Sequence, residues 1–182
     1  MRFSPAACAK ILCSNPSKIQ SQSLNELKDF SRTTDGLLEK LAICRNFEDA
    51  IKIYEAQIKI LGLNLNDVDE KIAEAVRIIE ANRGEVRISE IAEAVDLSVR
   101  QLERRFRTSA GLSPKRFARA RRIRATAINL VEKSEMNWAS RAAEMGFADQ
   151  SHLTHEFSTL TGRSPNSFAE LVKRIEHGEL VK

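Results

Sequence analysis

Two stretches of the chain decide the fold: AEAVDLSVRQLERRFRTSAGLSPKRF (residues 92–117) and AAEMGFADQSHLTHEFSTLTGRSPNSF (residues 142–168). The second stretch repeats the first. Identical residues recur 51 positions apart, and the pairs are Leu102/Leu153, Phe106/Phe157, Gly111/Gly162, Pro114/Pro165 and Phe117/Phe168. The earlier pair Ala92/Ala142 is offset by 50, so the second copy has one additional residue in its turn. Aligned positions that include a glycine and a proline indicate a duplicated structural unit.

The first copy has the pattern of a helix-turn-helix unit. A short helix is expected over Ile88–Val95, with Ser89 as its cap. A turn of three or four residues follows, and Ser98 then caps a second helix that runs to about Ser109.

The second copy repeats this pattern. Its short helix is expected over about Trp138–Met145, and Gly146 supplies the turn. Asp149 caps the next helix, which covers Gln150 to about Leu160. Trp138 and Phe147 are interpreted as core residues of this copy.

Other segments also have helical periodicity, and no alternation typical of strands is sustained, so the predicted fold class is all-α. Ser113-Pro114 and Ser164-Pro165 each place a cap and a first-turn proline before a helix. The first of these helices should run from Pro114 to Val131, a length of ~27 Å at ~1.5 Å per residue, and join the two copies. Upstream, helices are expected from Leu24 (capping box Ser23 and Glu26), from Phe47 (cap Asn46, end at Gly62) and after the cap Asn66 to near Gly84.

Positive charge is concentrated in one segment. Between residues 100 and 124 there are ten cationic side chains and one acid, Glu103, a local balance of +9 in a chain whose net charge is +4. A solvated helix face usually mixes both signs, so this segment favours a polyanionic partner, a nucleic acid. With the helix-turn-helix pattern, the expected partner is double-stranded DNA.

Helical geometry separates the core-facing side chains from the DNA-facing ones. In the first copy Leu102 and Phe106 face the core, and the opposite side carries Arg100, Arg104 and Arg107. In the second copy Leu153 and Phe157 are buried, and the opposite side carries Ser151, His155 and Ser158. The first copy should therefore dominate affinity for DNA. Glu103 either accepts a hydrogen bond from cytosine or pairs with Arg100 or Arg107 along the helix.

The segments Ile88–Thr126 and Ala142–Pro165 resemble the two helix-turn-helix units and the connecting helix of the AraC/XylS family of transcription regulators, in order and spacing. The resemblance implies that the two recognition helices read successive major grooves on one face of DNA. It implies these base-reading residues: Arg100, Gln101, Glu103, Arg104, Gln150, Ser151, Thr154 and His155. His155 stands where family members often have arginine. The expected DNA-binding set is completed by the basic residues Arg107, Lys115, Arg119 and Arg122.

The resemblance also divides the chain. Residues 66–182 are expected to form the DNA-binding domain, and residues 1–65 to be a helical remnant of a family sensor domain that has lost most of its effector-binding part. The helices over residues 24–61 could then form a homodimer, and RNA polymerase is a further expected partner. The alternative is a helical interaction or dimerisation module without specific DNA binding.

Several classes of function are disfavoured by the composition. The three cysteines and three histidines are not clustered, which argues against a metal site, a disulfide framework or an enzyme, and no cofactor is expected. No apolar run is long enough to span a bilayer, so a cytoplasmic protein without membrane contact is expected.

Overall fold

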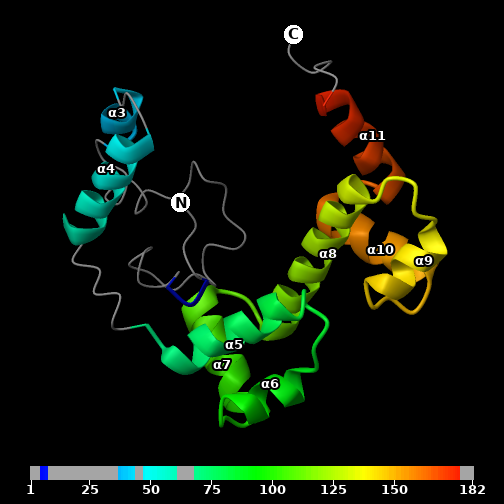
Figure 1. The fold of residues 1–182 in the computed structure, drawn as a ribbon. Coiled ribbons are helices and arrows are strands. Elements are labelled where there is room, and N and C mark those ends of the chain that lie inside the picture. The colour runs from blue at the N-terminus through cyan, green and yellow to red at the C-terminus, as the bar shows by residue number, and fades with distance from the viewer. Residues whose placement is uncertain (1–4, 8–36, 44–46, 61–67, 177–182) are drawn as a thin grey trace. The chain divides into compact units, whose positions relative to one another are not determined.

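The computed structural model describes residues 5–7, 37–43, 47–60 and 68–176 (Figure 1). Every regular element in these ranges is a helix, which confirms the predicted all-α fold class. The elements are η1 (Pro5–Ala7), α3 (Leu37–Ala42), α4 (Phe47–Ile60), α5 (Glu70–Ala81), α6 (Ile88–Ala94), α7 (Val99–Ala110), α8 (Pro114–Glu132), α9 (Trp138–Glu144), α10 (Gln150–Thr161) and α11 (Pro165–Glu176). The expected start at Leu24 and the expected Asn46 and Gly62 signals lie outside the described residues.

The chain divides into two compact units. The first unit comprises residues 1–78 and 88–114, and the second comprises residues 79–87 and 115–182. The first unit therefore contains η1, α3, α4, most of α5, α6 and α7. The second unit contains nearly all of α8 together with α9, α10 and α11. The first unit holds residues 92–114 of the first copy of the repeat, and the second unit holds the whole second copy.

Within the first unit, α5, α6 and α7 bury their apolar sides. Ile72 of α5, Ile91 of α6, and Leu102 and Phe106 of α7 are fully buried, as the helical periodicity predicts for α7. The recognition helix α7 begins and ends as the sequence indicates. Ser98 and the third helical residue, Gln101, form a reciprocal capping box. Gly111 ends the helix in the left-handed conformation, and its N–H donates to the carbonyl of Arg107 at 2.9 Å.

The cap predicted at Ser89 is wrong, and the cap predicted at Asn66 lies outside the described residues. Ser89 is the second residue of α6, which begins at Ile88, so its hydroxyl lies two positions after the capping position. The helix expected after Asn66 begins only at Glu70, and Asp69 caps it by accepting a hydrogen bond from the N–H of Ile72 at 3.2 Å. Asn66, Asp67 and Asp69 are all good capping residues, so local propensity alone does not select among them.

The second unit is built around one apolar cluster. Its buried members are Ile123, Leu130, Ala142, Met145, Phe147, Leu153 and Phe157, and Trp138 and Phe168 pack against them. This confirms the core role predicted for Trp138 and Phe147. Asp149 caps α10 as predicted, because its carboxylate accepts from the N–H of His152 at 2.7 Å.

The additional residue of the second copy is accommodated in its turn. Leu97 and Phe147 occupy equivalent positions, since their N–H groups donate to Ala92 and Ala142 at 2.9 and 2.8 Å. The inserted residue is therefore Ala148, whose N–H donates to the Nδ1 atom of His152 at 3.3 Å. The His152 ring also meets the Phe147 ring edge to face. His152 therefore bonds to the backbone of the turn and packs against its aromatic residue.

Candidate nucleic-acid interface

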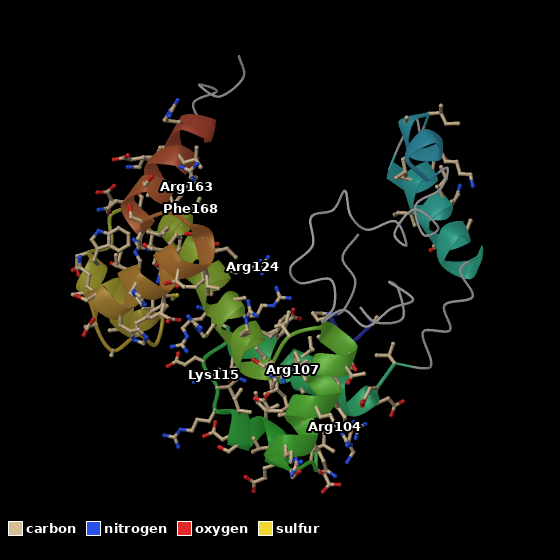
Figure 2. All side chains as sticks on the ribbon, turned by 180° about the vertical axis from the view of Figure 1, so that it is seen from behind. Arg104, Arg107, Lys115, Arg124, Arg163 and Phe168 are labelled. Atoms are coloured by element: carbon tan, nitrogen blue, oxygen red, sulfur yellow. The ribbon has the colours of Figure 1, made fainter. Side chains whose placement is uncertain are left out.

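The outer side of α7 carries the strongest candidate contacts. Arg100, Arg104 and Arg107 are exposed, and helical geometry puts them opposite the buried Leu102 and Phe106. Figure 2 labels Arg104 and Arg107 on this helix. Arginine side chains offer forked donors that fit guanine edges and phosphates. This face of α7 is thus suited to a polyanion.

Two other side chains of α7 are engaged within the protein. Glu103 forms an ion pair with Arg107, with 3.5 Å between the carboxylate and the guanidinium, which favours the pairing interpretation of Glu103. The side-chain oxygen of Gln101 accepts from the Ser98 N–H at 2.9 Å. Gln101 is exposed, so its contact with a base would compete with its role in the cap.

The corresponding side of α10 is not basic. Gln150, Ser151 and His155 are exposed, and Thr154 is half-buried. The twelve residues of α10 include no lysine or arginine, whereas α7 has four arginines. The difference agrees with unequal contributions of the two units to DNA affinity.

Two of the cations assigned to DNA from the sequence have partners within the second unit. Arg119 donates to both carboxylate oxygens of Glu156 in α10, at 2.7 and 2.9 Å. Arg122 donates to the carbonyl of Gly146 at 2.9 Å, and its guanidinium lies over the Phe147 ring. Lys115 is exposed. The DNA-binding roles of all three residues stay predictions.

A buried arginine was missed by sequence reasoning. Arg141 of α9 is 1 % exposed, and it stands at the repeat position where the first copy has the fully buried Ile91. Its guanidinium donates to the Asn129 side chain and to the carbonyls of Lys133 at 2.7 Å and Met136 at 3.2 Å. Burial lowers the pKa of Arg141, and the charge of Glu144 opposes that change. Comparing the two copies position by position would have flagged this residue.

The pKa of Glu156 lies below its ordinary value of 4.5. The hydrogen bonds from Arg119 are the main cause; burial acts in the opposite direction, and the charges of Arg119, His152 and Arg122 add to the lowering. A hydrogen bond from Lys133 similarly lowers the pKa of Glu144.

Acid should therefore destabilise the second unit through Glu156. Because the folded-state pKa is lowered, the ion pair contributes its full stability above pH 4.5 and loses it as the pH falls through the lowered pKa. Glu156→Gln removes this ionisation. Between about pH 5 and pH 3, the free energy of unfolding should fall more steeply in the parent than in the variant. Urea denaturation followed by the fluorescence of Trp138, the only tryptophan, measures both slopes, and equal slopes would contradict the pairing.

Other kinds of site are not found in the described part of the chain. There, no three His, Cys, Asp or Glu side chains are grouped so that they could hold a metal ion. Among the same residues, no helix has the length and apolar character needed to cross a membrane.

Two helix-turn-helix units, the first with a basic recognition helix, define a DNA-binding domain. Residues 91–170 match the family model described as a helix-turn-helix domain. The model is of the AraC type, so the match supports a DNA-binding domain of that type in this region. The match runs from α6 into α11 and thus includes both recognition helices. The family is one of DNA-binding regulatory domains and not of enzymes. A search of curated proteins found no match to the chain.

Proposed function

We propose that this protein is a sequence-specific transcription regulator of the AraC/XylS type whose helices α7 and α10 read two successive major grooves. The observation that carries the proposal is the repeated unit: each copy buries one side of its capped second helix and leaves the opposite side exposed. The exposed arginines of α7 supply the affinity. The exposed side of α10 supplies weaker contacts that depend more on DNA shape.

The length of helix α8 supports the proposal that a single chain reads both major grooves. Its 19 residues correspond to about 28 Å of continuous helix, which is comparable to one turn of B-DNA, ~34 Å. Because the two recognition helices are related by repetition within one chain, the site should be asymmetric. A duplex that does not match their separation would have to bend at an energetic cost.

The proposal includes the partners and the division of the chain. Double-stranded DNA is the ligand of residues 66–182, RNA polymerase is the protein partner, and the protein acts in the cytoplasm without a cofactor. Residues 1–65 are proposed as a remnant of a sensor domain, with a homodimer formed through residues 24–61. A protein-interaction module without specific DNA binding is the competing function. Titrating salt separates the two, because phosphate contacts make affinity fall steeply with salt concentration and an apolar interface does not.

Arg104 tests the recognition surface. Arg104→Ala should cost about 1–3 kcal/mol of binding free energy to a selected site and relax base preference at one or two positions, because an arginine fork is lost from a base edge. Arg77→Ala is the control, because it removes the same charge from an exposed arginine of α5 that is paired with Glu74. Equilibrium binding to the selected site and its single-base variants measures both effects. If Arg104→Ala lost no more affinity than the control and kept the same base preference, Arg104 would not be a base-contacting residue.

A further inference from the structure

In each unit a bidentate ion pair joins the second helix of the helix-turn-helix to an upstream helix or its capping residue. In the first unit, the Nε and Nη2 atoms of Arg105 in α7 donate to the carboxylate of Asp69 at 2.7 and 2.6 Å. In the second unit, the same two atoms of Arg119 in α8 donate to the carboxylate of Glu156 in α10 at 2.7 and 2.9 Å. Both acids are largely buried, with side chains 21 % and 18 % exposed. Such fork-to-carboxylate pairs fix geometry as well as adding energy.

The two pairs occupy equivalent positions of the repeat. Arg105 plus 51 is Glu156, which is the offset of the recognition helices. Asp69 plus 50 is Arg119, which is the offset found before the turn. The upstream offset agrees with part of the burial pattern, because the buried Val76 and Ile79 of α5 correspond to the buried Thr126 and Asn129 of α8.

The polarity of the pair is reversed between the copies. The recognition helix carries the arginine in the first unit and the acid in the second. If this position faced a phosphate, the acid of the second copy would repel DNA. What the copies share is thus the pair itself and not the charge presented by the recognition helix.

We propose that Arg105 and Glu156 are positioning residues that fix the rotation of α7 and α10 about their own axes, and that the cations Arg105 and Arg119 do not contact DNA. Arg105 is then distinct in role from its neighbour Arg104, which lies about 100° away around the helix and is exposed. Rotation of a recognition helix changes which bases its exposed side chains meet, so the pairs set sequence preference indirectly. This inference rests on the proposed function, because it assumes that α7 and α10 read DNA.

Reversing the charges in the second unit tests the inference most cleanly. Arg119→Glu and Glu156→Arg should each place like charges together, lower the melting temperature, weaken binding to the selected site by roughly tenfold and flatten base preference in the half of the site read by α10. The double variant Arg119→Glu/Glu156→Arg recreates the polarity of the first unit. It should recover both the melting temperature and the base preference. Failure of the double variant to recover either one would overturn the positioning role.

The first unit needs a different pair of variants, because Asp69 also caps α5. Arg105→Met and Arg104→Met remove the same charge from neighbouring positions while keeping an apolar stem. The slope of log affinity against log salt should be unchanged in Arg105→Met and less steep in Arg104→Met by about one phosphate contact. An equal decrease in both would make Arg105 a DNA contact and overturn the inference. If the parent selects no DNA site, the proposed function fails, and melting temperatures of the charge-reversal set still decide whether the pair stabilises the packing of α10 on α8.

Discussion

Replacing Phe106 with alanine is expected to destabilise the first unit by about 3–5 kcal/mol, the largest effect of any single truncation considered for that unit. Phe106 is fully buried in α7 and lies between the capped start and the Gly111 end of that helix. Alanine would leave a cavity beneath the recognition helix. A unit this small has little stability in reserve, so the change should unfold that unit and abolish high-affinity DNA binding.

Phe157→Ala is the matched change in the second unit. Phe157 is also fully buried and meets the Phe168 ring at a centroid distance of 5.4 Å. Trp138 packs against the same cluster, so its fluorescence reports on the second unit, while far-ultraviolet circular dichroism reports on all helices. Phe157→Ala should shift the fluorescence transition in urea. Phe106→Ala should shift part of the dichroism transition and leave most of the fluorescence transition in place. A Phe106→Ala melting curve that overlays the parent would remove Phe106 from the core.

Gly84→Ala should have the second large effect, about 2–5 kcal/mol, for two reasons that add. Gly84 has φ +83°, a conformation that side chains disfavour. A Cβ atom there would lie 2.1 Å from the Ala118 carbonyl oxygen and 2.7 Å from the Arg122 nitrogen, both backbone atoms of α8 within the second unit. Backbone in the middle of a helix cannot move aside cheaply, so the loop that enters the second unit would have to detach.

Gly162→Ala separates the two causes. Gly162 has a similar φ of +72°, and a Cβ atom added there would meet nothing within 4 Å. Gly162→Ala should therefore lower the free energy of unfolding only by the cost of the left-handed backbone conformation, about 1 kcal/mol. Urea denaturation followed by Trp138 fluorescence measures both glycine variants, because both positions belong to the second unit. Equal destabilisation by the two substitutions would show that the close approach of Gly84 to α8 has no energetic importance.

The repeat made the core of the recognition helices predictable from the sequence. Ser98, Asp149 and the two glycines at 111 and 162 are local signals, and each does in the structure what its residue type favours. Ser89 was misread because a capping residue is common near a helix start but only one position accepts the free N–H groups. Local sequence signals therefore predict which segments are helical more accurately than they predict the first residue of each helix.

The ion pairs were not predictable in the same way. Arg119 and Glu156 are 37 residues apart, and only the packing of α8 against α10 brings them together. In the sequence Arg119 is one of ten cations between residues 100 and 124, and the charge pattern alone predicts DNA binding for all of them. Arg141 shows the opposite case, because the repeat aligned it with Ile91 and its burial could have been anticipated.

Footprinting combined with stoichiometry, on a site selected from random duplex DNA, tests the central claim most directly. The account predicts one chain per asymmetric site, with protection of two successive major grooves on one face of the duplex, and stronger protection in the half contacted by α7. Arg104→Ala should weaken protection in that half. Protection of a single major groove per chain, or a strict requirement for a palindrome with one chain on each half, would show that α10 does not read DNA as proposed.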